Sequence, residues 1–281
     1  MRNLKELALP GTIEEFWEKK NQYGSKAIVI AGGTEIVSEP PEGVECLIDI
    51  RNLALDRIES DADAVTIGAA VTMESLTASE LAATLGCGML RDATCQGWPV
   101  AVRSAATIGG NVAGGDPFAD TPPVLLALGA SFHLQTPDGP RTVPADRFFL
   151  DYRKTAAEGS ILMAISIPNS PEEGRGAFMK VTPTAVDKAM INLGVYAEIV
   201  DGLCRNVRVA VGAVTRIPHR LEPVERLMDG EVLSPELVDA AAEEVVQNVE
   251  PMLDMRASVE HRRSLLSAVF KRAVHTLAQA G

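Results

Sequence analysis

The segment Thr107-Ile-Gly-Gly-Asn111 sets two glycines between polar neighbours, and a further pair, Gly114-Gly115, follows at once. Glycine permits positive φ and has no Cβ to block an approaching group. Successive backbone N–H groups in such a bend can point at one anion. Thr107 and Asn111 add side-chain donors, so this second glycine segment (residues 107–111) predicts a phosphate-binding bend.

A first glycine segment, Ala31-Gly-Gly-Thr-Glu35, follows the apolar, β-branched run Lys26–Ile30, which predicts a buried strand. Neither segment fits the GxGxxG or GxxxxGK[ST] pattern. One glycine pair after a strand is typical of a plain turn. Two such segments leave two interpretations open on the residues alone, plain turns or a diphosphate site.

The chain before residue 170 predicts alternating helices and strands. A helix that starts after the capping box Thr12–Glu15 and strands at 26–30 and 46–50 form a small βαβ-like unit over 1–55. Further strands are expected at 64–69, 131–135, 141–143 and 161–167, and helices at 73–85, 89–95 and 121–129.

The polar stretch Asn169–Arg175 is the best domain boundary in the sequence. Beyond it, strands are expected at 176–181, 192–199 and 207–214, and helices at 235–249 and 258–278. In the last strand Val207, Val209 and Val211 alternate with other residues, which indicates one buried face of an antiparallel sheet.

Composition argues against several functions. With 26 basic and 38 acidic residues, the net charge of −12 disfavours nucleic-acid binding. No signal peptide or membrane span is expected. The four cysteines form no CxxC pair and the four histidines no HExxH, so no metal site of its own is predicted. A reducing cytoplasm is the expected location.

Several motifs together resemble a known family. The two glycine segments, the helix Leu125-Leu-Ala-Leu-Gly129 with its leading Asp120, and the tail Asp254–Arg263 resemble the FAD-binding (medium) subunit of the molybdenum hydroxylases. This is the xanthine dehydrogenase and carbon monoxide dehydrogenase family, and the resemblance spans nearly the whole chain.

The resemblance implies an α+β fold. Residues 1–170 would form a two-lobed FAD-binding domain of the vanillyl-alcohol-oxidase type, with lobes at about 1–55 and 56–170. Residues 176–281 would form a C-terminal domain made of a three-stranded antiparallel sheet with helices.

It also implies a set of cofactor-binding residues and no catalytic acid, base or nucleophile. Those that would wrap the pyrophosphate and ribitol are Ala31, Gly32, Gly33, Thr34 and Glu35, and Thr107, Ile108, Gly109, Gly110 and Asn111. Asp120 would bind the cofactor from the helix start, Leu162 would lie near the isoalloxazine, and Lys180 near the flavin or its acceptor side. The alternatives are a helix cap for Asp120, strand core for Leu162 and a solvated strand-end charge for Lys180.

The function implied is electron transfer. A large partner subunit would hold a molybdopterin, and a small partner two [2Fe–2S] clusters, in a dimer of heterotrimers. Electrons would reach FAD on this chain and then NAD or another acceptor. Two alternatives are a self-sufficient flavin oxidoreductase and a non-catalytic assembly subunit that has lost flavin.

The sequence departs from the family pattern in three places. Lys180 is followed by Thr184 and Lys188, where relatives often have Lys-x-x-x-Arg-x-x-x-Asp, which puts the electron acceptor in doubt. Val102-Arg103-Ser104 replaces the usual Ile-Arg-Asn. The four-cysteine cluster insertion of some relatives is absent.

Overall fold

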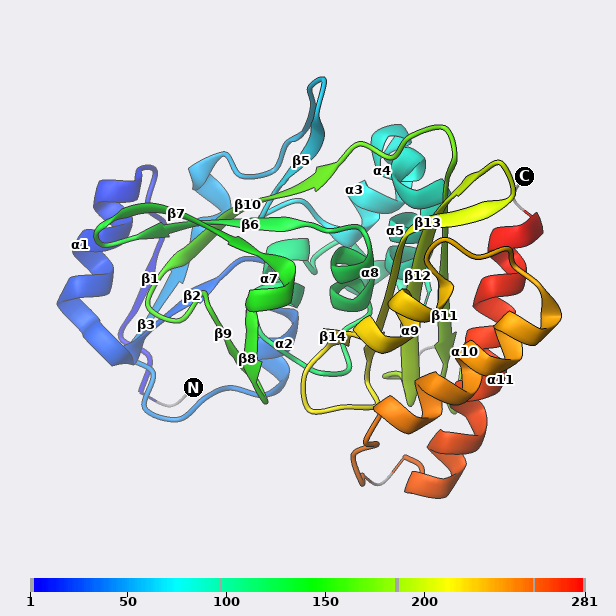
Figure 1. Cartoon of the computed structure of the whole chain (residues 1–281). Helices are drawn as coiled ribbons and strands as arrows, with labels where there is room; N and C mark the ends of the chain where they lie inside the picture. Colours follow the sequence, from blue (N-terminus) through cyan, green and yellow to red (C-terminus); the bar gives the residue numbers. More distant parts are fainter. Residues whose placement is uncertain (1–2, 97, 185–186, 255, 280–281) are drawn as a thin grey trace.

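The computed structural model describes residues 3–96, 98–184, 187–254 and 256–279. Figure 1 shows an N-terminal lobe on the left, a central sheet, and a C-terminal unit on the right whose long helices lie on its outer side. The candidate site is formed where the loops and short helices of the first two parts meet the third.

The N-terminal lobe is a parallel sheet with a covering helix. Strands β1 (Glu6–Ala8), β3 (Cys46–Asp49) and β2 (Ala27–Ile30) lie in the order β1-β3-β2. Helix α1 (Ile13–Tyr23) begins as predicted, with the Thr12 side chain accepting from the N–H of Glu15 at 3.2 Å. The predicted βαβ-like unit is confirmed, and β1 is an addition to it.

The central unit consists, in the residues described, of a five-stranded antiparallel sheet and six short helices. Its strand order is β4 (Ile58–Ser60), β5 (Ala64–Gly68), β10 (Ile161–Pro168), β6 (Ser131–Thr136) and β7 (Gly139–Pro144). The helices are α3 (Met73–Ala78), α4 (Glu80–Thr84), α5 (Met89–Cys95), α6 (Val100–Arg103), α7 (Ile108–Ala113) and α8 (Thr121–Ala127). The helix predicted over 73–85 is interrupted because Ser79 caps α4, accepting from the N–H of Ala82 at 3.2 Å.

Small elements connect these layers. They are α2 (Thr34–Ser38), the hairpin of β8 (Phe149–Asp151) and β9 (Lys154–Thr155), and the 3-10 turns η1 (Gly24–Lys26), η2 (Ile50–Leu53), η3 (Leu85–Gly88) and η4 (Ala145–Arg147).

The C-terminal sheet has four antiparallel strands, so the predicted three-stranded sheet was wrong. Its order is β11 (Gly174–Val181), β12 (Ile191–Val200), β13 (Leu203–Gly212) and β14 (His219–Arg220). The extra strand pairs only with Ala210 and Val211, and two residues are too few to show an alternating pattern. Helices α9 (Glu222–Met228), α10 (Pro235–Asn248) and α11 (Val259–Gln279) follow.

This sheet is buried on both faces, whereas the alternation in β13 predicted one. Val207, Val209 and Val211 pack with residues of α9, α10 and α11. On the opposite face, Ala210 and Tyr196 belong to the core of the central unit. Helix α8 lies against that face, and all seven of its residues are buried.

Candidate functional site

The first glycine segment presents open backbone donors. Strand β2 ends at Ile30, Gly33 adopts a left-handed conformation with φ +68°, and α2 begins at Thr34. Within the described ranges, the N–H groups of residues 32–35 donate to no protein acceptor. Successive free amides at a tight bend can converge on an anion. This segment therefore has backbone donors free for an anion, as the predicted phosphate-binding bend requires.

The second glycine segment uses its donors differently. Thr107 caps α7, its Oγ1 accepting from the N–H of Gly110 at 3.1 Å. The N–H groups of Ile108, Gly109 and Asn111 donate at 3.0 Å to the carbonyls of residues 71, 69 and 107. These four amides are satisfied by protein, so the predicted open bend is instead the first turn of a helix.

The two glycine segments are in contact. A Cβ on Gly32 would lie 1.7 Å from the carbonyl oxygen of Ala105, just before the second segment. The carboxylate of Glu35 lies 3.4 Å from the place where a Cβ on Gly114 would be. Gly110 on α7 and Gly114 at its C-cap are both exposed. A strip of helix without side chains therefore lies beside the open donors of the first segment.

The remaining residues of the two segments differ in their accessibility. Thr34 is exposed and Asn111 half-buried, whereas the Ile108 side chain is wholly buried. Ala31 is partly buried against the core of the N-terminal lobe. Asn111 Oδ1 accepts from the hydroxyl of Thr121 at 2.6 Å, which ties α7 to the start of α8.

Asp120 lies in a buried network that joins the central and C-terminal units. Lys180 Nζ, on β11, lies 2.5 Å from Asp120 Oδ2, and the two side chains are 5% and 2% exposed. Asn192 Nδ2, on β12, donates to Asp120 Oδ1 at 2.8 Å and to the carbonyl of Ala119 at 3.0 Å. Burial raises the pKa of Asp120, and the Lys180 ammonium opposes that shift.

This geometry removes two of the alternative interpretations. The Asp120 side chain makes no capping hydrogen bond with α8, so the cap interpretation was wrong. Lys180 is not a solvated strand-end charge, because its ammonium is buried against Asp120. Asn192 was not predicted as a site residue, although a lone amide in the apolar run of β12 is a signal for a buried polar contact.

Leu162 lies on β10 and is 5% exposed. It packs in the same core as Ile108 and Val112 of α7. The β10–β6 register is irregular between Leu162 and Ala164. The structure therefore places Leu162 beneath α7, within the strand core.

Charged side chains surround the first glycine segment. Arg153, at the turn of the β8–β9 hairpin with φ +55°, lies 3.4 Å from Glu35 and 3.3 Å from Glu39. Burial raises the pKa of Glu35, and the neighbouring Asp116 raises it further. Asp116 pairs with Lys188 at 2.5 Å. Arg153 carried no signal in the sequence, because its partners lie more than a hundred residues away.

Thr184 and Lys188, which stand where relatives often have arginine and aspartate, make separate contacts. Lys188 is the ion-pair partner of Asp116, whereas Thr184 Oγ1 donates to Asp187 Oδ2 at 2.9 Å. In the described part of the chain, no group of three or more His, Cys, Asp or Glu side chains is placed to hold a metal ion. None of the helices described there is both long and apolar enough to span a bilayer.

Comparison with known families gives two adjoining matches. Residues 3–170 match the family described as FAD binding domain in molybdopterin dehydrogenase. Residues 176–277 match the family described as CO dehydrogenase flavoprotein C-terminal domain.

Individual relatives are similar over almost their whole length. The chain is 29% identical over 275 residues to the carbon monoxide dehydrogenase medium chain of Hydrogenophaga pseudoflava, covering 95% of this chain and 94% of that one. It is 29% identical over 266 residues to the nicotine 6-hydroxylase medium subunit of Paenarthrobacter nicotinovorans, covering 90% and 89%. A solved structure of the Hydrogenophaga enzyme, in a form lacking the Mo-pyranopterin moiety of its cofactor, superposes with a TM-score of 0.94 at 29% identity, covering 98% of each chain.

Proposed function

This chain belongs to the FAD-binding medium subunits of the molybdenum hydroxylases, and from that membership we propose that it transfers electrons through one bound FAD. Electrons would come from [2Fe–2S] clusters of a partner chain and leave to NAD or another acceptor. Bound FAD supplies the redox chemistry, and the protein sets its position and potential. The proposal therefore assigns binding and positioning roles to this chain's residues.

The observation that carries the proposal is the open donor set beside a bare helix strip. Four consecutive N–H groups, at residues 32–35, have no protein acceptor in the part of the chain that the structure describes. They adjoin the exposed Gly110, which has no side chain of its own, and Gly114, where the Glu35 carboxylate lies 3.4 Å from the Cβ position. A pyrophosphate needs such donors, and the groups on either side of it need a surface that lets them approach the backbone. The residues present fit the cofactor.

We assign the binding roles accordingly. The amides of residues 32–35 hold the pyrophosphate, and Thr34 adds a hydroxyl. Gly110 and its neighbours from Thr107 to Asn111 form the wall along which the cofactor lies. Asp120, with Lys180 and Asn192, fixes the start of α8 and through Thr121 the position of Asn111. Leu162 supports α7 from below.

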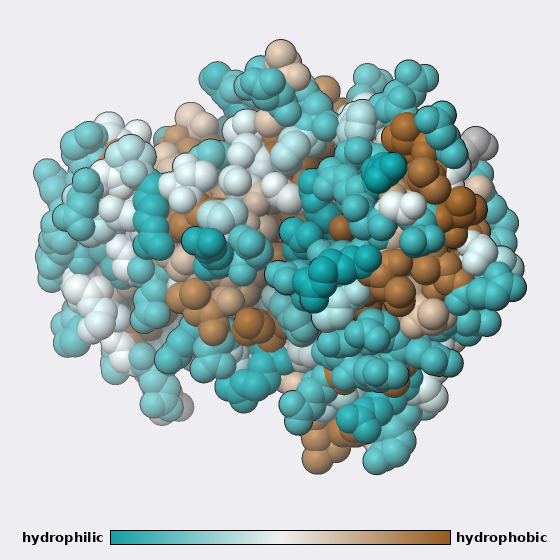
Figure 2. Space-filling model, in the orientation of Figure 1, coloured by the Kyte–Doolittle hydropathy of each residue, from teal (hydrophilic) through white to brown (hydrophobic). Residues whose placement is uncertain are grey.

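We further propose the assembly in which this chain works. A large molybdopterin-binding subunit and a small subunit with two [2Fe–2S] clusters would complete a heterotrimer that dimerises. Support comes from the relatives that are named medium chains or subunits. Val37 on α2 and Leu150 on β8 are exposed, and Figure 2 shows hydrophobic surface where these elements reach the molecular face. This surface borders the first glycine segment, as a site for an electron-donating partner should.

We propose that the chain is organised as two domains with different roles. Residues 1–170, with lobes at about 1–55 and 56–170, form the cofactor domain. Residues 176–281 form a C-terminal domain that supports it through β11 and β12.

The test is flavin content, measured by absorbance after purification, in the native chain and two glycine variants. We expect one FAD per chain. Gly110→Val should lower FAD affinity by roughly tenfold or more, about 1.4 kcal/mol. The variant should still fold, since the only atom near a Cβ at this position is Thr107 Oγ1 at 3.1 Å.

Gly11→Val is the matched control, because Gly11 is exposed and the one atom near its Cβ position, a Glu15 carboxylate oxygen, is 3.6 Å away. It should bind FAD as the native chain does. A native chain that folds without ever binding flavin, or a Gly110→Val variant with full occupancy, would refute the proposal. Substrate turnover by the isolated chain would favour a self-sufficient flavin oxidoreductase over a subunit.

A further inference from the structure

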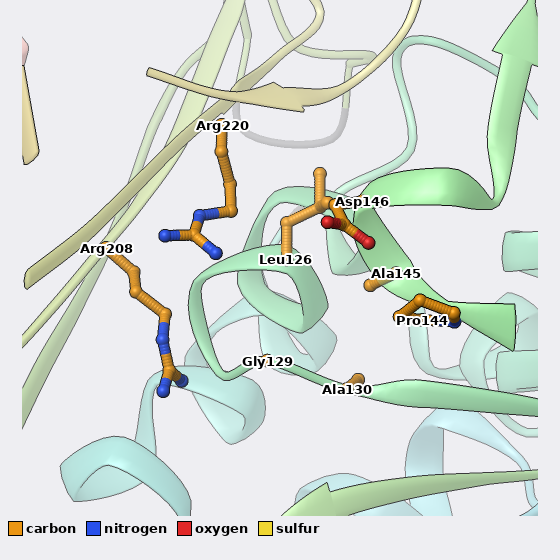
Figure 3. Close-up of a pocket in the computed structure, with 8 residues that line it drawn as sticks. All are labelled: Leu126, Gly129, Ala130, Pro144, Ala145, Asp146, Arg208 and Arg220. Atoms are coloured by element: carbon orange, nitrogen blue, oxygen red, sulfur yellow. The ribbon is translucent and has the colours of Figure 1, made fainter. Parts of the chain in front are cut away.

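A separate cavity lies at the other end of α8, between that helix, β13 and β14. Its volume is about 210 Å³, ample for a small molecule rather than a single water. The lining residues are Leu126, Gly129, Ala130, Pro144, Ala145, Asp146, Arg208 and Arg220 (Figure 3). It adjoins the seam between the central and C-terminal units, and the proposed electron-transfer function does not use it.

Two guanidinium groups enter this cavity from neighbouring strands (Figure 3). Arg220 is held by Glu225, with Nε and Nη2 donating at 2.9 and 2.6 Å to its two carboxylate oxygens. Its third nitrogen, Nη1, donates to no acceptor within the described ranges. Arg220 is therefore oriented by one carboxylate while keeping a free N–H edge.

Arg208 is the unusual member of the pair. Across residues 3–96, 98–184, 187–254 and 256–279, no carboxylate lies within 4.0 Å of its guanidinium. Nη2 donates to the amide oxygen of Asn206 at 3.0 Å, and Nη1 makes a long contact of 3.4 Å with the carbonyl of Ala127. A half-buried cation normally has an anionic partner, because desolvating an unpaired charge is unfavourable. Arg208 lacks one.

The charged groups around Arg208 also favour a bound anion. Burial lowers the pKa of Arg208, and the nearby charge of Arg220 lowers it further. Glu198 and Glu225 are the acidic groups that oppose this effect. Asp146, on the facing wall, is exposed and forms no ion pair with either arginine. An anion between the two guanidinium groups would relieve their repulsion.

We propose that this cavity binds a small oxyanion, a carboxylate or a phosphate, between Arg208 and Arg220. Guanidinium groups match the planar, paired oxygens of such ligands. The oxyanion is either a free small molecule or a carboxylate side chain of a partner subunit. Asp146 tunes the site by repelling the bound charge.

The experiment measures the unfolding midpoint of the full chain against inorganic phosphate and against succinate, with sodium chloride holding the ionic strength constant. We expect a saturable rise in the midpoint. Arg208→Gln should weaken the apparent affinity by roughly tenfold or more. Arg205→Gln is the matched control, since Arg205 is an exposed arginine of the same strand, and it should leave the affinity unchanged.

Asp146→Asn supplies a test of opposite sign, because removing the facing carboxylate should tighten binding several-fold. It also keeps the proposal testable if Arg208→Gln folds poorly. Equal responses of the native chain and the Arg208→Gln and Arg205→Gln variants would indicate a general salt effect and overturn the proposal. Weaker binding by Asp146→Asn would overturn it too. If phosphate or succinate still raises the unfolding midpoint in the assembled complex, the natural ligand is a free small molecule. If the rise is lost on assembly, a carboxylate of the partner subunit occupies the cavity.

Discussion

The two glycine segments are similar in sequence and opposite in structure. Residues 32–35 leave their N–H groups open, and the side chains around them are linked by half-exposed ion pairs such as Glu35–Arg153. Residues 108–111 donate all their N–H groups to protein. The nearby start of α8 is held by the buried Asp120–Lys180 pair. The first segment therefore keeps backbone donors available for the proposed cofactor, whereas the second uses its donors within the protein.

A glycine pair in the sequence indicates that another group comes close to the backbone, but it does not indicate whether that group is protein or ligand. At Gly32 and Gly109 the approaching group is protein backbone, with carbonyl oxygens 1.7 and 2.5 Å from a Cβ position. Gly110 and Gly114 are exposed, and the nearest groups to their Cβ positions are Thr107 Oγ1 at 3.1 Å and the carbonyl oxygen of Gly110 at 3.0 Å. At Gly110 and Gly114, unlike Gly32 and Gly109, the missing side chain faces the molecular surface.

The largest expected effect comes from removing Lys180, the buried partner of Asp120 at the start of α8. Lys180→Met leaves Asp120 buried without its cation, which should lower the free energy of unfolding by about 3–5 kcal/mol. Chemical denaturation would measure this loss. Asp120→Asn combined with Lys180→Met should restore most of it, because no charge is then left unpaired.

The pH dependence of Lys180→Met has a defined sign. Burial raises the pKa of Asp120, and loss of Lys180 removes what opposes that shift. Stability of the variant is then retained at low pH, where Asp120 is protonated, and lost as pH rises through its raised pKa. A deficit that is the same at pH 5 and pH 8 would contradict a charged pair at this position.

Disturbing the contact between the segments should have the next largest effect. Gly32→Ala places a methyl group 1.7 Å from the carbonyl oxygen of Ala105, so roughly 1–3 kcal/mol of stability and most FAD binding should be lost. Gly33→Ala is the comparison, because its cost of about 1 kcal/mol comes from the left-handed backbone alone. Thermal unfolding and flavin content report both, and equal effects would show that the contact is unimportant.

The Thr107 cap of α7 should contribute less to the free energy of unfolding. Thr107→Ala removes the acceptor for the N–H of Gly110 and should cost about 1 kcal/mol. Thr107→Ser keeps the hydroxyl and should stay close to the native value. If serine were as harmful as alanine, the threonine methyl rather than the cap would be the important group.

The ion pairs around the open segment should matter least. Arg153→Gln removes the half-exposed pair with Glu35 and the more exposed pair with Glu39, each worth roughly 0.2–1 kcal/mol at most. The pKa of Glu35 is raised, so this contribution exists above that pKa and disappears as pH falls through it. Unfolding midpoints at pH 8 and pH 5 would show the difference. Lys154→Gln, on the same hairpin, serves as the control and should change neither value.

Local signals in the sequence predicted most of the elements. Thr12 and Glu15 gave the start of α1, and β-branched runs gave β2 and β3. The two-residue β14 had no period to detect. The second buried face of the C-terminal sheet was also missed, because small residues such as Ala210 do not reveal which neighbour covers them.

The local conformation of the candidate site could be predicted from the sequence better than the contacts between its residues. The open first segment follows from a strand that ends in two glycines. Thr107 as a helix cap could have been inferred, since a threonine commonly accepts from the N–H of the residue three positions later, here Gly110. The Asp120–Lys180–Asn192 network joins residues about sixty and seventy positions apart, so no local pattern encodes it.

Helix α8 makes the cofactor half and the C-terminal half mutually dependent. It belongs to the first by sequence, yet its buried residues pack against the sheet of the second. A protease cut in the exposed turn at 169–173 should therefore yield two fragments that elute together on a sizing column. Either half expressed by itself would display a bare apolar surface and should aggregate, so a split gene would have to co-express both pieces.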